Sequence, residues 1–175
     1  MPGFTILDSG LATYNIVILT FTPAATATDV LQLGGFGGST KVRWVSVSGT
    51  TTTARQQPVG LLRRSAVNTG GTSTLQTPQK ADSADGASQN TVRLWTVNPA
   101  GLGTLVGMVD GGTFAVTTGS AIQDRAIFQY EFQTSKPIVL NGGNDLLSIN
   151  FQVGTAPIAT VAADKFDMDI WWTER

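Results

Sequence analysis

Cysteine and histidine are both absent from the 175 residues of this chain. The absence of cysteine excludes disulfides, cysteine-ligated zinc or iron–sulfur centres and thiol nucleophiles. The absence of histidine removes the usual general base near neutral pH and the commonest ligand of transition metals. Serine or cysteine catalysis through a histidine is therefore impossible. We expect no enzyme activity, no catalytic residues and no cofactor.

Charged residues are also scarce, at 13% of the chain, about half of the ~25% that soluble domains usually carry. The only glutamates are Glu131 and Glu174. A glycosidase needs two carboxyl groups in one cleft, and neither glutamate belongs to a motif that supplies a second one. We interpret both as residues on solvated strand faces, and a carbohydrate-active enzyme is the least favoured hypothesis.

The net charge of −1 gives no field that would attract nucleic acid or a membrane. Residues 1–80 carry a charge of +4 and residues 81–175 a charge of −5. This asymmetry indicates either association with a partner or with further copies, or simply scattered surface charge. The chain start has no basic signal-peptide region, and the apolar run Ile16–Phe21 is far shorter than the ~20 residues of a membrane span. We expect no membrane partner.

Residues that favour strands and turns make up much of the chain. It has 20 glycines and 7 prolines, and no stretch of about twelve residues shows the apolar spacing of an amphipathic helix. Short runs of β-branched and aromatic residues recur between turn signals instead. We therefore predict an all-β fold, a single-domain jelly-roll β-sandwich of roughly 8–10 antiparallel strands over residues 1–175.

The C-terminal run Phe166–Thr173 has the clearest strand pattern. Because successive side chains of a strand point to opposite faces, one face should be buried and should carry Phe166, Met168, Ile170 and Trp172. Trp171 should then point outward. The run Tyr14–Phe21 is almost continuously apolar, which indicates burial on both faces or in a sandwich core. Thr40–Ser48 slips out of alternation near Trp44, which predicts a β-bulge.

Two segments in the middle of the chain are predicted to be connections. The long polar stretch 68–89 reads as a loop, and loops of this length are usually functional, ordered by a partner or mobile. Leu105–Val109 and Thr113–Thr117 are predicted to form a hairpin that turns at Asp110-Gly111-Gly112.

Motifs that could bind a ligand are incomplete. The glycines at 34, 35, 37 and 38 lack the Gly-Lys-Ser/Thr ending of a phosphate-binding loop, so we interpret them as turn residues. Asp82 and Asp85 resemble a fragment of a calcium loop without its closing glutamate. A second acidic group, Asp164, Asp167 and Asp169, has the spacing of an outer strand face. We expect no metal site in either group.

Aromatic and basic residues supply the candidates for an interface. Arg43 and Trp44 are adjacent, and such pairs can stack on sugars or nucleotides. Arg63 and Arg64 are the only neighbouring basic pair, and a subunit contact and a salt bridge at a strand end explain them equally well. An outward Trp171 suggests contact with another chain, although a loop of the same chain could also cover it.

Three short segments carry a resemblance to a known family. The first is Val45–Thr50, a strand that runs into a turn of small residues, and the second is Leu62–Ser73, a strand that enters a Gly/Thr loop. The third is the ending, with Leu140–Gly143, Leu147–Asn150 and Met168–Glu174. In this order they resemble the jelly-roll decoration or cement proteins of tailed bacteriophages and prophages. The resemblance covers most of the chain, but not its first thirty residues or the region 105–118.

The resemblance implies a structural role in the virion, after assembly in the bacterial cytoplasm. Proteins of that type bind the outside of the capsid shell, so the implied partner is the major capsid protein, and they often form dimers or trimers. We accordingly expect a homo-oligomer, either trimer or dimer. The arginines at 43, 55, 63 and 64 are expected to face an acidic patch of the shell or of a neighbouring copy. The alternative function is a tail or fibre module that binds a carbohydrate receptor.

Overall fold

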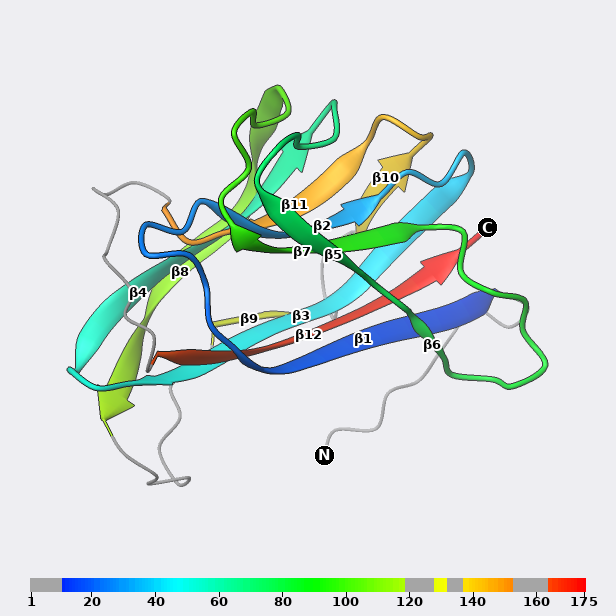
Figure 1. Cartoon of the computed structure of the whole chain (residues 1–175). Helices are drawn as coiled ribbons and strands as arrows, with labels where there is room; N and C mark the ends of the chain where they lie inside the picture. Colours follow the sequence, from blue (N-terminus) through cyan, green and yellow to red (C-terminus); the bar gives the residue numbers. More distant parts are fainter. Residues whose placement is uncertain (1–10, 119–127, 132–136, 153–163) are drawn as a thin grey trace.

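The computed structural model describes residues 11–118, 128–131, 137–152 and 164–175 (Figure 1). Within these ranges all regular secondary structure is β, and no helix is present. The all-β prediction is confirmed. The twelve strands are β1 Ala12–Phe21, β2 Asp29–Gly34, β3 Ser39–Thr51, β4 Arg55–Arg64, β5 Thr72–Gln76, β6 Gln79–Lys80, β7 Thr91–Val97, β8 Leu105–Thr118, β9 Phe128–Glu131, β10 Ile138–Asn141, β11 Leu146–Asn150 and β12 Lys165–Glu174.

The strands form two layers that pack face to face (Figure 1). Sheet A has the order β6-β1-β12-β3, and β9 and β10 pair with successive parts of β3. Sheet B has the order β5-β7-β2-β11-β4-β8. All these pairings are antiparallel. A short parallel contact between the ends of β3 and β8 joins the two sheets at one side.

The strand order is that of a jelly roll with an insertion. Without β5, β6 and β7, sheet A reads β1-β12-β3 followed by β9 and β10, and sheet B reads β2-β11-β4-β8. The chain therefore alternates between the layers at both ends and places its last strand beside its first, as in the eight-stranded double Greek key. The predicted jelly-roll sandwich is confirmed, but the described residues form twelve strands instead of the predicted 8–10.

Residues 65–104, which we call the insertion, account for the strands beyond that frame. They connect β4 to β8 and add β5 and β7 to the edge of sheet B and β6 to the edge of sheet A. The prediction of an irregular loop over 68–89 is wrong in this respect, since β5 and β6 lie within it. β5 pairs through its main chain and leaves Leu75 exposed, so it has no apolar alternation that a sequence pattern could reveal.

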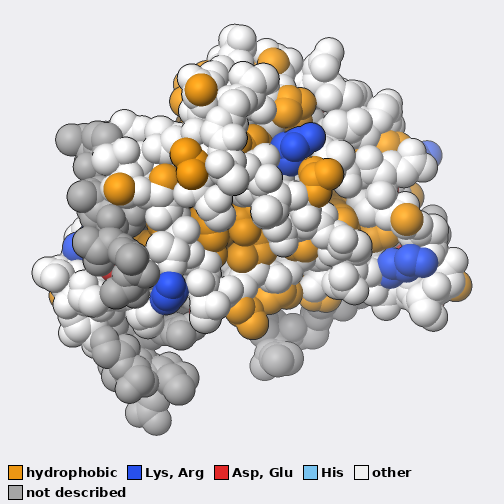
Figure 2. Space-filling model, viewed as in Figure 1, with side chains coloured by type: hydrophobic (Ala, Val, Ile, Leu, Met, Phe, Trp, Pro, Cys, Tyr) orange, Lys and Arg blue, Asp and Glu red, His pale blue; other side chains and the backbone are white. Residues whose placement is uncertain are grey.

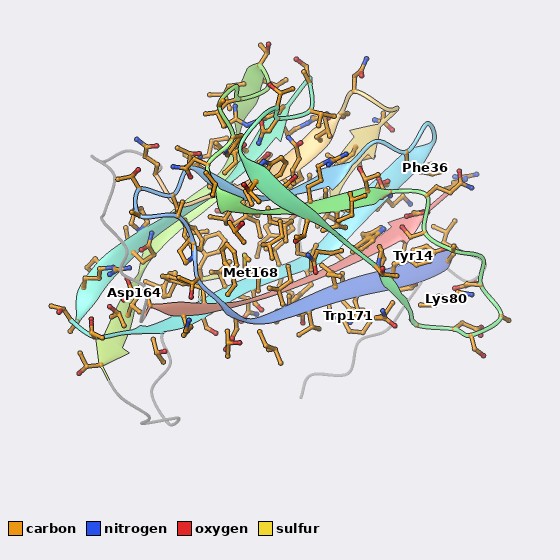
Figure 3. All side chains as sticks on the ribbon, in the orientation of Figure 1. Tyr14, Phe36, Lys80, Asp164, Met168 and Trp171 are labelled. Carbon is orange, nitrogen blue, oxygen red and sulfur yellow. The ribbon has the colours of Figure 1, made fainter. Side chains whose placement is uncertain are left out.

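The core between the sheets contains the predicted face of β12. Phe166, Met168, Ile170 and Trp172 are all buried. Figure 3 shows Met168 directed into the space between the layers and Trp171 on the other side of sheet A. β1 buries only one face, because its apolar residues Val17 and Leu19 are exposed. The sandwich-core interpretation of β1 is therefore the correct one.

The predicted bulge lies at Trp44. Trp171 of β12 pairs with Trp44, but the next residue, Trp172, pairs with Val42. Arg43 is thus the extra residue on β3. Since a bulge places two residues opposite one, it allows Trp44 to keep its outward orientation while Val42 and Val45 both remain buried.

The predicted hairpin at residues 105–117 is wrong. β8 runs without a turn from Leu105 to Thr118 and pairs with β4 through Gly111 and Gly112. These glycines suit a close approach to neighbouring atoms. A Cβ on Gly111 would lie 3.1 Å from both the sulfur of Met108 and the carbonyl oxygen of Val59.

Candidate functional site

The outer face of sheet A brings together three of the five predicted interface residues. Trp44 and Trp171 are direct cross-strand partners, and Asn15 of β1 lies beside Trp171 in the same row. The next row contains Val17, Asp169 and Ser46. With Arg43 at the bulge, these residues form a surface that we call the tryptophan face: Asn15, Val17, Arg43, Trp44, Asp169 and Trp171.

One hydrogen bond fixes the polar part of the tryptophan face. The indole Nε1 of Trp171 donates to Oδ2 of Asp169 at 3.1 Å. Burial raises the pKa of Asp169, and this hydrogen bond lowers it by less. Its other carboxylate oxygen, Oδ1, is buried and has no hydrogen-bond partner among the described residues. The carboxylate is therefore held against the indole ring rather than extended into water.

The chemistry of this face suits binding. Two half-buried indole rings offer apolar surface, and tryptophan is enriched where protein surfaces meet. Asp169 and Arg43 add one acidic and one basic group that can orient a partner. No histidine or cysteine exists in the chain to act as base or nucleophile.

Arg63 and Arg64 lie away from the tryptophan face, on β4 of sheet B. Arg63 makes a bidentate ion pair with Asp145, in the turn before β11. Arg64 is buried and makes a bidentate ion pair with Asp29, with donor–acceptor distances of 2.5 and 2.9 Å. Arg64 is therefore removed from the set of surface candidates, and the salt-bridge interpretation of this pair is correct.

Asp29 is the centre of a buried polar cluster that no sequence pattern predicted. Besides Arg64, its carboxylate accepts hydrogen bonds from Asn68 at 2.8 Å and from Asn150 at 2.7 Å. Arg64 also donates to the carbonyl of Gly103, and Gly103 donates to Asn68. Because a buried charge needs partners for each of its hydrogen-bonding sites, this cluster holds both ends of the insertion against sheet B.

A second buried cluster closes the insertion onto sheet A. The carboxylate of Glu174 accepts hydrogen bonds from Ser88 Oγ at 2.5 Å, the Gln89 amide at 3.0 Å, Asn90 Nδ2 at 2.8 Å and Trp172 Nε1 at 2.9 Å. Burial raises the pKa of Glu174, but the hydrogen bonds together lower it by more. The pKa of Glu174 is therefore below its ordinary value. The prediction of a solvated position for Glu174 is therefore wrong.

The two acidic groups considered for calcium have partners within the chain. Asp164 is buried and accepts hydrogen bonds from Thr51 at 2.6 Å and from Arg55 at 2.8 Å. Asp82 accepts one from the Ala84 amide, and Asp85 accepts one from Thr13. Within the described residues, no group of three or more acidic side chains is placed to hold a metal ion.

The expectation of a basic docking stretch must also be corrected. Of its four arginines, Arg55, Arg63 and Arg64 make ion pairs inside the chain, with Asp164, Asp145 and Asp29. Only Arg43 belongs to the tryptophan face. The paired residues are 109 positions apart for Arg55, 82 for Arg63 and 35 for Arg64. No local sequence pattern could therefore have shown these ion pairs.

Comparison with known proteins does not identify the chain. No protein family, curated protein or solved structure matches it. In the part of the chain that the structure describes, no helix is long and apolar enough to cross a membrane.

Proposed function

We propose that this chain is a structural protein of a bacteriophage virion, a decoration or cement protein that binds the outer surface of the capsid and stabilises the shell. Its partner is the major capsid protein, and its place is the mature virion after assembly in the bacterial cytoplasm. The resemblance of the segments around Val45–Thr50, Leu62–Ser73 and the C-terminal strand supports this proposal, as does the jelly-roll strand order.

The observation that carries the proposal is the pairing of Trp44 with Trp171 on the outer face of a sheet. Large indole rings are seldom left on a surface without use, and they are among the residues that dominate binding energy at interfaces. Many copies bound to a repeating shell would act together, so a shallow contact from each copy is sufficient.

Cryo-electron microscopy of virions from the phage or prophage that encodes this sequence tests the proposal. We expect added density at equivalent, repeated positions on the capsid exterior. Particles made without the gene should lack that density and should release their DNA at a lower temperature. Normal particles with no density on the head would contradict the proposal.

Matched variants test whether the tryptophan face makes the contact. The double variant Trp44→Thr/Trp171→Thr keeps strand-forming residues but removes both rings. When added to particles that lack the protein, it should fail to attach at a temperature at which it is still folded, although loss of the Trp171–Asp169 hydrogen bond lowers its melting temperature. The control Leu75→Thr/Val97→Thr removes two exposed side chains of β5 and β7 and should attach normally.

The alternative is a tail or fibre module that binds a carbohydrate receptor. The specific observation in its favour is that Trp44 and Trp171 are cross-strand partners on one face, with the carboxylate of Asp169 hydrogen-bonded to Trp171, since sugar rings stack on aromatic faces. Binding of the purified protein to defined glycans on an array, lost in Trp44→Thr/Trp171→Thr, together with density on the tail, would favour this function over capsid decoration.

A further inference from the structure

The first half of β8 exposes an unusual number of apolar side chains. The exposed fraction is between 41% and 60% for Leu105, Val106, Met108 and Val109. Gly107, which lies between the two pairs, and Asp110, which follows the second pair, are less exposed. This pattern repeats every three residues. A regular strand would instead turn every second side chain to the same side.

Two β-bulges explain the pattern. Leu61 and Leu62 of β4 pair with Asp110 and Met108, which leaves Val109 as an extra residue. Arg63 and Arg64 pair with Gly107 and Leu105, which leaves Val106 as a second one. A bulge sets two residues against one and re-aims their side chains.

Met108 and Leu105 pair with Leu62 and Arg64, whose rows lie on the outer face of sheet B, and the extra residues Val109 and Val106 are exposed beside them. The position of Met108 supports this assignment. Its sulfur lies next to Gly111. Gly111 pairs with Gly60, and Gly60 pairs with Asn150. Asn150 belongs to the buried polar cluster on the side of sheet B opposite to the core.

Two further apolar residues lie where the insertion meets this end of β8. Val67 and Leu102 are 42% and 45% exposed, and they flank Asn68 and Gly103, which hydrogen-bond to each other. We call the six residues the β8 patch: Val67, Leu102, Leu105, Val106, Met108 and Val109. Figure 2 shows hydrophobic side chains at the top of the molecule, the end at which β8 begins in Figure 1.

We propose that the β8 patch is the contact between two copies of this chain, packed patch to patch about a two-fold axis. An isologous contact brings every residue close to the same surface on the partner, so charges within the patch would repel. Residues 65–71 and 101–109 contain no charged residue. A partner attracted by charge would find no complementary group there.

The size of the patch fits this occupant. Six aliphatic side chains that are each about half exposed present on the order of 500 Å² of apolar surface, which is within the range of the largest patch on a typical monomer. Two copies together remove about 1,000 Å² from water, which reaches the lower bound for a specific interface. The two bulges also disfavour the competing arrangement, in which the edges of β8 extend one sheet into the next.

The dimer is independent of the proposed function. The β8 patch lies on sheet B and the tryptophan face on sheet A, so a two-fold contact through the patch leaves both tryptophan faces accessible. In a capsid context the dimer supplies two attachment surfaces, which strengthens weak contacts through effective concentration.

Sedimentation velocity over roughly 1–200 µM protein tests the inference. We expect a dimer for the wild-type chain. The variant Val106→Lys/Met108→Lys should raise the dimer dissociation constant at least about 100-fold, because each lysine must lose its hydration in the contact. The control Leu75→Lys/Val97→Lys changes equally exposed residues of β5 and β7 and should remain dimeric. A wild-type monomer at the highest concentration, a trimer, or a dimeric patch variant would each overturn the inference.

A cross-linking measurement covers the case in which the lysine variant does not fold. The chain has no cysteine, so Val106→Cys creates a single thiol, and a short bismaleimide should join two copies of this variant. Leu75→Cys should give no cross-linked dimer. Equal cross-linking of both variants would contradict the proposed contact. If the lysine variant stays dimeric but no longer attaches to particles, the β8 patch is the capsid contact; the dimer contact and the assignment of attachment to the tryptophan face then both fail, whereas capsid decoration itself stands.

Discussion

Four of the charged side chains that the structure describes have internal roles. Asp29, Arg64, Asp164 and Glu174 are all buried, and each makes several hydrogen bonds to groups distant in the sequence. A buried charge is costly unless it is paired and hydrogen-bonded, so these residues tolerate few alternative arrangements. Their effect is to fix the insertion and the C-terminal strand onto the sandwich in one geometry.

Glu174 gives a prediction for pH. Its pKa in the folded protein is lowered below the ordinary 4.5, so its ionised form adds stability at pH 7 that is lost as the pH falls through the folded pKa. Glu174→Gln should lower the free energy of unfolding by about 1–3 kcal/mol at pH 7, since hydrogen bonds to a charged group are lost. Urea unfolding should show this difference shrinking as the pH falls below 4.5.

The other glutamate serves as the control for that measurement. Glu131→Gln changes β9 rather than the contact between the insertion and β12, and should alter the free energy of unfolding at pH 7 by no more than about 0.5 kcal/mol. A Glu174→Gln variant whose stability deficit stayed constant down to pH 3 would contradict the assigned role of the carboxylate.

Arg63 and Arg64 give a matched test of burial. Arg64→Met leaves Asp29 charged and buried without its cation, which should lower the free energy of unfolding by about 3–5 kcal/mol. Arg63→Met removes a pair whose arginine side chain is 37% exposed, which should cost at most about 1 kcal/mol. Denaturant unfolding of both variants measures the contrast. Equal losses would show that Arg64 does not carry the buried cluster.

At the scale of elements, β12 organises the molecule. It lies between β1 and β3 and pairs with both along most of its length. Ile170→Asp should prevent folding, because it places an unpaired charge at a fully buried position. The control Leu75→Asp puts the same charge on an exposed site of β5 and should melt cooperatively near the wild-type temperature. A soluble Ile170→Asp protein with a cooperative melt would show that the buried face is misassigned.

Elements with local alternation could be predicted from the sequence, and elements fixed by distant contacts could not. β7 is observed at the predicted Thr91–Val97, and the bulge at Trp44 follows from a visible change of phase. The glycines at 111 and 112 resemble a turn, but pairing with β4 keeps β8 extended.

The candidate site divides in the same way. Trp171 could be placed outward from alternation in its own strand, but the loss of alternation near Trp44 left that residue unplaced, and the pairing of the two depends on the register between β3 and β12. The partners of Asp29 and Glu174 could not be inferred, because a contact between residues 35 to 121 positions apart leaves no periodicity. The β8 patch was hidden for a similar reason, since its two bulges arise from pairing with β4.

At the scale of the whole molecule, the fold offsets part of the charge asymmetry of the sequence. The first 80 residues are basic and the rest are acidic, which suggested electrostatic attraction to a partner or another copy. In the structure, Arg55 pairs with Asp164 and Arg63 with Asp145. Both ion pairs join the basic half to the acidic half within one chain, so two charges of each sign are compensated internally.

This internal pairing predicts that association depends little on salt. Ionic screening weakens contacts between exposed charges, whereas burial of apolar surface is not weakened by salt and is strengthened by salts such as sulfate. Since the β8 patch is uncharged, the dimer dissociation constant should change less than about threefold between 50 and 500 mM sodium chloride, and sodium sulfate should lower it. Sedimentation velocity at these salt concentrations measures both effects. A dimer that dissociates in 500 mM sodium chloride would show that ion pairs between copies, and not the β8 patch, hold it together.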